Sequence, residues 1–433
     1  MRYTYEHMED LEGISYPDFA EYSQNLVLYG AGINGALCAF ALKELGVEFL
    51  CFCDSDPSKQ GMQYIGYPVY SPRECSRRFP DAAVLFDVYC SGKDMENLAA
   101  LGYEKILFPA SLFLNLDCDK AAKFVTEQLG RGDDGYSFRE SVDGFQVFEW
   151  IDEYMIRGVG YVNHRQEISR SVNLDLTDRC TLRCKNCLAL KPYFTNRAEM
   201  SWEQMEQVID RLVSLKWFRR FHLLGGEPFL YAHLDKVLDK LCGVPEVEHI
   251  NIITNGTVIP GEPVLELLQN PKIMVRISYY GELSKNYREL EALCTRRGIN
   301  VRVHAQRWKD IGRALETVSD GPQTQARYNE CSQRAGAFFY VLHGKVTLCP
   351  FAANTHALGL YSSDGEDLID LLAPGSAEPL FEQLKTLYWR EKPLNACRYC
   401  NGWLPYATKP VPVGMQYEAG EQPVLPSYSK QAE

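Results

Sequence analysis

Cysteines in two groups are the residues of this sequence best suited to hold a metal centre. The first group is Cys180, Cys184 and Cys187, with the spacing C-x3-C-x2-C, directly after an apolar segment at 172–176. A cubane iron–sulfur cluster contains four irons and is normally held by four cysteine thiolates. A loop with three thiolates therefore leaves one iron open to another ligand. A structural zinc site is tetrahedral and closed, so three cysteines without a local fourth ligand fit it poorly.

The second group lies in the C-terminal region and consists of Cys331, Cys349, Cys397 and Cys400, of which the last two form a C-x2-C pair. Two apolar segments around residues 343–344 predict a β-hairpin before Cys349. Four thiolates can complete an iron–sulfur cluster with no open iron. The same cysteines can form a structural zinc site, and the spacing leaves both interpretations open.

Strands and helices alternate along the chain between the two cysteine groups. The predicted strands are 172–176, 220–224, 249–253, 272–278 and 300–304. The helical patterns between them are 202–212, which Ser201 and Gln204 begin as a capping box, 233–242, 263–269 and 284–297. This alternation predicts a parallel sheet, whose functional loops lie at the carboxyl ends of the strands. The peptides Gly-Gly-Glu-Pro at 225–228 and Thr-Asn-Gly at 254–256 occupy such ends.

In this order, these motifs resemble those of the radical S-adenosylmethionine (SAM) enzymes. The resemblance implies that Cys180, Cys184 and Cys187 hold a 4Fe-4S cluster whose open iron is chelated by SAM. It also implies that an electron from a flavodoxin- or ferredoxin-like donor cleaves SAM to a 5′-deoxyadenosyl radical, which abstracts hydrogen from a substrate. The residues that the resemblance assigns to SAM are Gly225, Gly226, Glu227, Pro228, Asn255, Ser278 and Asn186, the last at a position where the family often has an aromatic residue.

The second cysteine group resembles the "twitch" extension of radical SAM enzymes, the shorter relative of the SPASM domain. The resemblance implies an auxiliary 4Fe-4S cluster on Cys331, Cys349, Cys397 and Cys400, with a role in electron transfer or structural support. The thiols of Cys242 and Cys294 fall on the apolar sides of predicted helices and are expected in the core. The candidates for a base, which a dehydrogenation requires, are the strand-end residues Arg276, Arg302, His304, Tyr279 and Tyr280, for each of which a structural role is equally open.

The N-terminal third predicts a Rossmann-like module. A strand at 25–29 leads into a GxGxxG loop, and a helix at 36–45 and a second strand at 48–53 follow. Glycines and a helix N-terminus suit a phosphate, and an acid after the second strand suits ribose hydroxyls. The candidate nucleotide site is therefore Gly30, Gly32, Gly35 and Asp54. A fold kept for packing or docking, without a nucleotide, is an equal alternative.

The segment after this unit, at 65–72, resembles small Rossmann-like modules that accompany sugar-modifying and polysaccharide-assembly enzymes. Further strands are expected at 82–86 and 105–108, and a glycine-rich linker at 130–135. Phe148, Ile151, Tyr154 and Met155 have the spacing of an amphipathic helix. The expected domains are a Rossmann-like module at 1–130, a linker and helix at 131–170, a partial (β/α) barrel of radical SAM type at 171–320, and a twitch-like hairpin and helix domain with a tail at 321–433.

Composition limits the classes of function. The chain has 433 residues, enough for two or three domains, and its net charge of −12 argues against a general nucleic-acid binder. No apolar run approaches the roughly 20 residues that span a bilayer, and the N-terminus lacks the apolar core of a signal peptide. Clustered cysteines in a long chain favour metal binding in the cytoplasm over a secreted disulfide scaffold.

The resulting expectation is an α/β radical SAM enzyme that removes hydrogen from a carbohydrate or a nucleotide-linked sugar, with oxidation or epimerisation as the outcome and a role in polysaccharide or natural-product biosynthesis. The sugar rests on the proteins that the N-terminal module resembles. One alternative is a radical SAM enzyme that modifies a peptide or protein. Another is a non-catalytic, metal-stabilised binding protein in which the Rossmann-like module is the working part.

Overall fold

The structure is a computed structural model, and it describes residues 17–86, 97–129, 144, 147–148, 151, 155, 168–196, 199–305, 308–312, 319, 321–331, 338–360, 366–403, 410–418 and 420–424. The chain divides into two compact units, Met1–Glu167 and Ile168–Glu433. The expected linker at 130–135 and Tyr154 of the expected amphipathic helix lie outside the described residues.

The N-terminal unit contains a six-stranded sheet with the order β3-β4-β2-β1-β5-β6. Its strands are β1 (Leu26–Tyr29), β2 (Cys51–Cys53), β3 (Gln63–Tyr64), β4 (Tyr67–Tyr70), β5 (Ala83–Phe86) and β6 (Ile106–Leu107). Every pair is parallel except β3 with β4. The helical segments are η2 (Phe19–Tyr22), α1 (Ile33–Glu44), α2 (Pro72–Arg78), α4 (Ala110–Phe113) and α5 (Cys118–Leu129). The strands expected here are confirmed, with shorter bounds.

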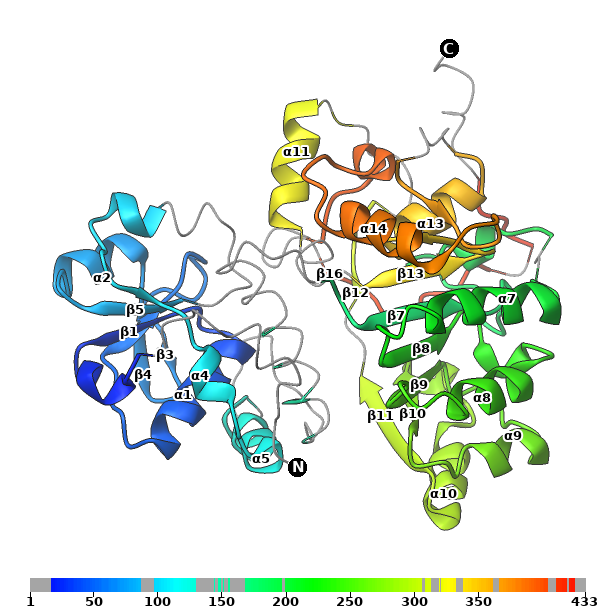
Figure 1. The fold of residues 1–433 in the computed structure, drawn as a ribbon, viewed down its shortest axis with the longest axis horizontal. Helices are drawn as coiled ribbons and strands as arrows, with labels where there is room; N and C mark the ends of the chain where they lie inside the picture. The colour runs from blue at the N-terminus through cyan, green and yellow to red at the C-terminus, as the bar shows by residue number, and fades with distance from the viewer. Residues whose placement is uncertain are drawn as a thin grey trace. The chain divides into compact units, whose positions relative to one another are not determined.

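The second unit contains an eight-stranded sheet with the order β11-β10-β9-β8-β7-β13-β14-β15. The strands between the two cysteine groups are β7 (Ser171–Asp175), β8 (Arg220–Leu224), β9 (His249–Thr254), β10 (Ile273–Tyr279) and β11 (Asn300–Ala305). They pair in parallel throughout. The helices α7 (Trp202–Val213), α8 (Leu234–Cys242), α9 (Glu262–Leu267) and α10 (Tyr287–Arg297) follow the strands, and Figure 1 shows the first three along one side of the sheet.

Alternation of side chains gives this sheet two different faces. On β7 and β8 the residues Val172, Leu174, Phe221 and Leu223 belong to the apolar core beneath the helices. The alternate positions carry polar side chains, for example His222 on β8. The same alternation continues on β9 and β10, where isoleucine and valine face the core. The polar face is therefore the one available to a site.

The C-terminal hairpin belongs to the same sheet as the parallel strands. Strands β13 (Phe339–Leu342) and β14 (Lys345–Thr347) pair in antiparallel fashion, which confirms the predicted hairpin. Its two turn residues, His343 and Gly344, have φ values of 48° and 76°, as a two-residue type I′ turn requires. The hairpin was expected in a separate domain, but β13 pairs in parallel with β7. This pairing satisfies the backbone groups that β7 would otherwise leave exposed at a sheet edge.

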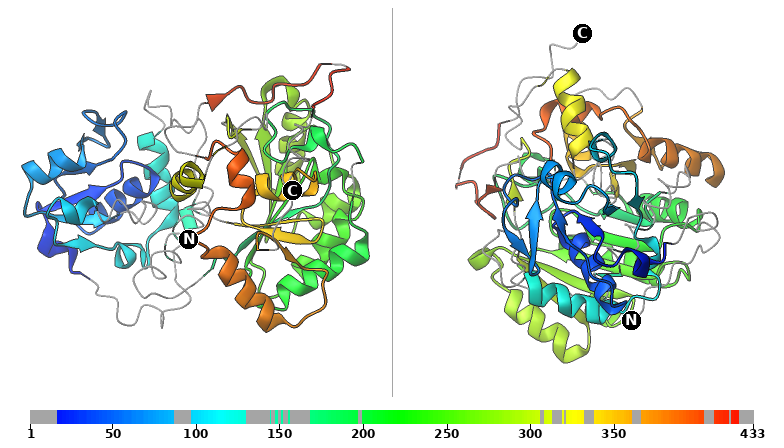
Figure 2. Two further views of the ribbon diagram at one scale, coloured as in Figure 1. Left: turned by 90° about the horizontal axis from the view of Figure 1, so that it is seen from above. Right: turned by 90° about the vertical axis from the view of Figure 1, so that its left-hand side faces the viewer.

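The remaining elements of this unit include α13 (Pro350–Ala357), which packs against the hairpin strands, and several short segments. They are η3 (Lys191–Tyr193), η4 (Pro228–Leu230), η5 (Gly281–Leu283), α11 (Gly321–Glu330), α13 (Pro350–Ala357), β15 (Ile369–Asp370), α14 (Ala377–Tyr388) and η6 (Asn395–Tyr399). Figure 2 (left) shows the yellow hairpin strands beside the green strands of the same sheet. Two short strands, β12 (Trp308–Lys309) and β16 (Pro410–Val411), form a separate pair. Within the described residues, no helix has the length and apolar character needed to cross a membrane.

Candidate functional site

The three-cysteine loop follows β7 directly and brings its thiols close together. Burial raises the pKa of the Cys180 thiol to about 12, and the neighbouring Cys187, Glu227 and Cys184 add to the increase, while the Leu182 N–H opposes it. Thiols that raise one another's pKa need a nearby positive charge to become thiolates together. The metal ions of an iron–sulfur cluster supply that charge, so the donor set fits the group that the spacing predicts.

Polar hydrogens point at two of these sulfurs. The Leu182 N–H lies 3.4 Å from Cys180 Sγ, and Asn255 Nδ2 lies 3.6 Å from the same atom. The Gln416 amide donates to Cys184 Sγ over 2.9 Å. Asn186 lies in the turn between Cys184 and Cys187. Hydrogen bonds of this kind stabilise the thiolate form that a cluster requires.

The Gly-Gly-Glu-Pro loop after β8 runs along the backbone that leads into the cysteine loop. The Gly226 N–H donates to Thr177 O over 2.7 Å, and the Glu227 N–H donates to Arg179 O over 2.8 Å. A Cβ atom on Gly226 would lie 2.1 Å from Arg179 O, and one on Gly225 would lie 2.7 Å from Thr177 O. Gly225 also has a φ of 148°. Only glycine allows these two loops to approach so closely.

Glu227 is fully buried and connects this loop to the end of β9. Its carboxylate accepts hydrogen bonds from Thr254 Oγ1 at 2.8 Å, from the Asn255 N–H at 2.9 Å and from the Phe229 N–H at 3.2 Å. Burial raises the pKa of Glu227 to about 7, although these hydrogen bonds oppose the increase. Pro228 begins the short helix η4 beside it. Glu227 and Asn255, which are both predicted to bind SAM, therefore link the loop after β8 to the end of β9.

A buried ion cluster that was not predicted from the sequence lies beside the cysteine loop. Lys191, which follows the third cysteine, lies 2.8 Å from Asp175 and 2.7 Å from Asp178, and its side chain is 2% exposed. Tyr340 of β13 donates to Asp175 over 2.5 Å, and His343 Nε2 lies 2.9 Å from Asp178. Burial raises the pKa of Asp175. For Asp178, hydrogen bonds from His343 and Lys191 outweigh burial and hold the pKa below its usual value.

Two of the candidate bases are neighbours on the polar face of the sheet. Arg276 of β10 and Arg302 of β11 are partners in the parallel register. Ser278, the candidate for the SAM ribose, is buried. It lies two residues beyond Arg276 on β10 and is in register with His304. The His304 side chain lies outside the described residues. Tyr280 follows β10, and burial raises the pKa of its phenol, with a further contribution from the cysteine loop.

His222 is a polar residue of the same face that the sequence analysis did not single out. It is buried, and Asn251 Nδ2 lies 3.3 Å from its Nδ1. Burial lowers its pKa to about 3, and the charges of Arg276 and Arg220 lower it further. His222 is therefore a neutral imidazole. His222 lies between Phe221 and Leu223, which face the core, so the alternation along β8 predicts that His222 faces the polar side of the sheet.

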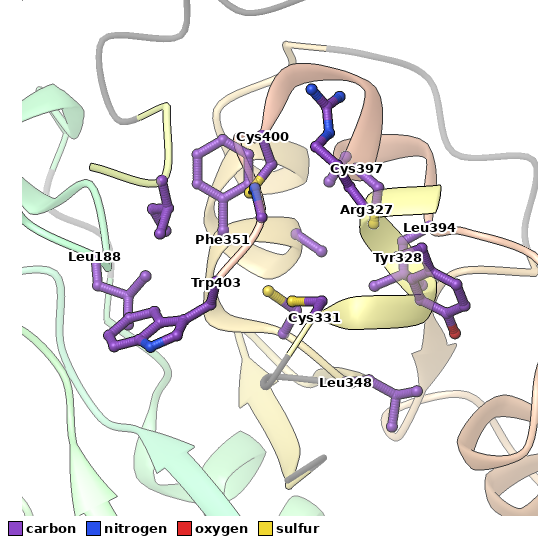
Figure 3. Close-up of a pocket in the computed structure, with 15 residues that line it drawn as sticks. Leu188, Arg327, Tyr328, Cys331, Leu348, Phe351, Leu394, Cys397, Cys400 and Trp403 are labelled. Atoms are coloured by element: carbon purple, nitrogen blue, oxygen red, sulfur yellow. The ribbon is translucent and has the colours of Figure 1, made fainter. Parts of the chain in front are cut away.

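The structure brings the four cysteines of the second group around one cavity of about 50 Å³. Figure 3 shows Cys331, Cys397 and Cys400 around it, with Phe351 and Trp403 beside them. Burial raises the pKa of Cys349 to about 11, and it also raises the pKa values of Cys397 and Cys400, to which the neighbouring cysteines add. Across the described part of the chain, no three His, Cys, Asp or Glu side chains are grouped as ligands of a single metal ion.

The residues predicted to bind a nucleotide lie after β1, at the start of α1 and after β2, and the acid among them already has internal partners. Asp54 is buried and accepts hydrogen bonds from the Ala31 N–H at 2.8 Å and from Lys59 at 3.0 Å. Its other oxygen accepts from the Asp56 N–H at 2.9 Å. A Cβ on Gly35 would lie 2.0 Å from Gly30 O, so Gly35 serves the packing of helix against loop. Gly32 is the N-cap of α1.

Comparison with known proteins places a family match on the site just described. Residues 174–314 match the family model described as the Radical SAM superfamily. A GTP 3′,8-cyclase of Clostridium perfringens (strain SM101 / Type A) is 27% identical over 126 residues, which cover 29% of this chain and 38% of that protein. A GTP 3′,8-cyclase of Pseudomonas syringae pv. syringae (strain B728a) is 33% identical over 87 residues, which cover 20% and 26%. The chain thus spans well under half the length of these relatives.

Solved structures align with more of the chain, but at lower sequence identity. BtrN in complex with AdoMet and 2-DOIA aligns with 18% identity and a TM-score of 0.37, over 55% of this chain and 94% of BtrN. Streptococcus suis SuiB bound to the precursor peptide SuiA aligns with 15% identity and a TM-score of 0.28, over 49% of this chain and 50% of SuiB. The family match begins at the end of β7 and includes the three-cysteine loop and the Gly-Gly-Glu-Pro loop. The similarity to the Radical SAM superfamily thus lies in residues 174–314, the part of the chain that carries both loops.

Proposed function

We propose that this protein is a radical SAM enzyme that abstracts hydrogen from a carbohydrate or a nucleotide-linked sugar, with oxidation or epimerisation as the outcome. The observation that carries the proposal is the three-cysteine loop packed against the Gly-Gly-Glu-Pro loop. Cys180, Cys184 and Cys187 would hold a 4Fe-4S cluster. When bound, the cluster and SAM supply one electron and a 5′-deoxyadenosyl radical that takes a hydrogen atom from the substrate.

The residues of the chain would hold SAM at the carboxyl ends of β7 to β10. Gly225, Gly226 and Glu227 would accept the SAM ammonium through carbonyl and carboxylate oxygens. Ser278 suits the ribose, and Asn186 and Asn255 suit polar atoms of the nucleoside. Each carboxylate oxygen can accept more than one hydrogen bond, so Glu227 can bind an ammonium while it keeps its bonds to Thr254 and Asn255.

The arginine pair on the polar face favours a substrate that carries an anion. Arg276 and Arg302 are partners in the register of β10 and β11. A guanidinium does not lose its proton in proteins and binds phosphate oxygens in a bidentate manner. These residues are thus better suited to anion binding than to proton abstraction. A nucleotide-linked sugar carries a diphosphate that these two arginines could bind. The arginine pair therefore supports a nucleotide-linked sugar over a free carbohydrate as the substrate.

Cys331, Cys349, Cys397 and Cys400 would hold the auxiliary 4Fe-4S cluster. Their sulfurs surround one buried cavity, and four thiolates leave no open iron. Such a cluster suits electron transfer from the substrate radical during an oxidation, and a flavodoxin- or ferredoxin-like protein would reduce the first cluster. Zinc on the same cysteines is the alternative. Binding of a nucleotide to the N-terminal unit stays a prediction, because Asp54 is occupied by internal partners.

The proposal is tested on the purified, anaerobically reconstituted protein. It requires about eight irons per chain if both clusters are of the four-iron type, and reductant-dependent release of 5′-deoxyadenosine. Cys184→Ala should abolish this release, because the loop would retain only two thiolates. A protein that holds zinc and never cleaves SAM would refute the proposal.

Substrate class is decided by isotope transfer. Candidate sugars and nucleotide-linked sugars with deuterium on the ring carbons are offered beside deuterated peptides. Deuterium should appear in 5′-deoxyadenosine from the sugar compounds alone. Transfer from a peptide instead would move the protein to the peptide-modifying class.

A further inference from the structure

The chain segment 414–417 crosses the cysteine loop and forms a two-stranded contact with it. Cys184 and Gln416 are partners in an antiparallel bridge. The Lys185 N–H donates to Met415 O over 2.7 Å, and the Tyr417 N–H donates to Arg183 O over 2.9 Å. The two backbone bonds lie on either side of Cys184, which is itself buried.

The Gln416 side chain uses both ends of its amide on this loop. Its Oε1 accepts from the Arg183 N–H at 2.6 Å, and its Nε2 donates to Cys184 Sγ at 2.9 Å and to Gly414 O at 2.6 Å. The amide of a glutamine has one acceptor oxygen and two N–H donors. Every one of these groups therefore has a partner, and the partners fix which way the amide faces.

Further contacts hold the segment over the loop. Arg183 Nη2 donates to Glu421 O over 2.7 Å, and Lys185 Nζ pairs with the Glu421 carboxylate at 3.0 Å. Gly414 has a φ of 71°, and a Cβ there would lie 2.8 Å from the Leu283 side chain. The segment thus passes too close to its neighbours for a side chain at that point.

We propose that Gln416 is a positioning residue of the SAM-binding cluster, which donates a hydrogen bond to the Cys184 thiolate and holds the segment 414–417 across the loop. The inference rests on the proposed function, because it requires a cluster at Cys184. A hydrogen bond to a ligand sulfur stabilises the reduced cluster, which carries the greater negative charge, and so raises its reduction potential. The segment also limits the access of water and chelators to Cys184.

The substitutions that test this are Gln416→Glu and Gln416→Met. Glutamate keeps the shape but replaces the N–H donor with a negative oxygen beside the thiolate, while methionine removes the donor without adding a charge. Gln422→Glu is the matched control. Gln422 lies beyond the segment 414–417, and its Oε1 accepts a hydrogen bond from the Arg183 guanidinium at 3.3 Å. Among the described residues no hydrogen bond joins it to a cysteine, so the control adds the same charge away from the thiolates.

The experiment follows the reconstituted full-length protein by redox titration with electron paramagnetic resonance, and by iron release to an added chelator. The signal of the SAM-binding cluster is the one that changes when SAM is added. Its potential should be most negative in Gln416→Glu, intermediate in Gln416→Met, and equal to that of the wild type in Gln422→Glu. Chelators should remove iron faster from both Gln416 variants than from the control.

Equal potentials and equal iron loss in Gln416→Glu and Gln422→Glu would overturn the inference, because the effect would then be one of charge alone or absent. If Gln416→Glu does not fold, Gln416→Met gives the same decision through the missing donor. Failure of the proposed function looks different. In that case the wild type itself would show no signal that responds to SAM, and Cys184→Ala would not lower its iron content.

Discussion

At the scale of single residues, Glu227 is a buried acid whose charge changes between mildly acidic and neutral pH. Its pKa in the folded protein is about 7, above the ordinary value of 4.5. The folded state therefore binds a proton more tightly than the unfolded state between these values. The contribution of Glu227 to the free energy of unfolding should therefore be greatest below pH 4.5. This contribution should be lost as the pH rises through 7.

Replacement of Glu227 by Gln should remove this pH dependence. The free energy of unfolding of the metal-free wild type should fall by roughly 3 kcal/mol between about pH 4.5 and pH 7, relative to that of the variant. Urea unfolding at a series of pH values measures both proteins. If the free energies of unfolding of the two proteins change in parallel across this pH range, the raised pKa of Glu227 is wrong.

At the scale of elements, the ion cluster joins the cysteine loop to β7 and to the β13–β14 hairpin. Lys191→Met would leave Asp175 and Asp178 buried without their cation. Removing one partner of a buried ion group costs about 3–5 kcal/mol, and denaturant unfolding should show a loss of this size. Lys240→Met is the control, because Lys240 pairs with Glu206 and Asp210, whose side chains are 43% and 57% exposed, and exposed pairs contribute about 1 kcal/mol or less. Equal losses would contradict a role specific to Lys191.

The hairpin turn gives a second prediction at this scale. Gly344 has a φ of 76°, and a Cβ there would lie 2.6 Å from the Leu372 side chain. Gly359 has a similar φ of 68°, with nothing within 4 Å of its Cβ position. Both Gly→Ala changes should cost about 1 kcal/mol for the backbone conformation, and Gly344→Ala should cost more because of the clash. Thermal unfolding of the two variants separates the contributions, and a smaller loss for Gly344→Ala would be inconsistent with this turn.

At the scale of the whole molecule, the two cysteine groups should load independently. The double change Cys397→Ala with Cys400→Ala should lower the iron content from about eight to about four per chain, while SAM cleavage persists. The spare thiol of Cys294 is buried in the core, so Cys294→Ala should leave the iron content unchanged. Iron and sulfide analysis measures all three proteins. An unchanged iron content in the double variant, with zinc lost instead, would assign the second group to zinc.

Local pattern was enough to predict the parallel strands and the loops that end them. The expected strand at 220–224 and the capping box at Ser201 agree with the structure, because side-chain alternation and capping depend on near neighbours in sequence. The helix expected from residue 284 begins at Tyr287, since 281–283 form a short 3-10 turn and the Ser284 hydroxyl accepts the Tyr280 N–H instead of starting a helix.

The partners of the cysteine loop could not be predicted in the same way. Tyr340 and His343 follow the aspartates that they contact by 165 residues. Nothing in the local pattern around Gln416 marks it as a neighbour of Cys184. The burial of Lys191 could have been predicted from the sequence. A lysine among apolar residues next to the cysteine loop predicts a buried ion pair when acids lie on the strand before it.

The distance along the chain between Arg183 and Gln416 has a consequence for how the protein is made. These residues are 233 positions apart, and ribosomes add roughly 5–20 residues per second. The cysteine loop therefore leaves the ribosome on the order of tens of seconds before the segment that covers it. For the first part of that interval, until Phe339–Leu342 are made, β7 also lacks its neighbour β13 and presents an open edge. If the loop holds the proposed cluster, its thiols stay uncovered by the segment 414–417 until translation has passed residue 416.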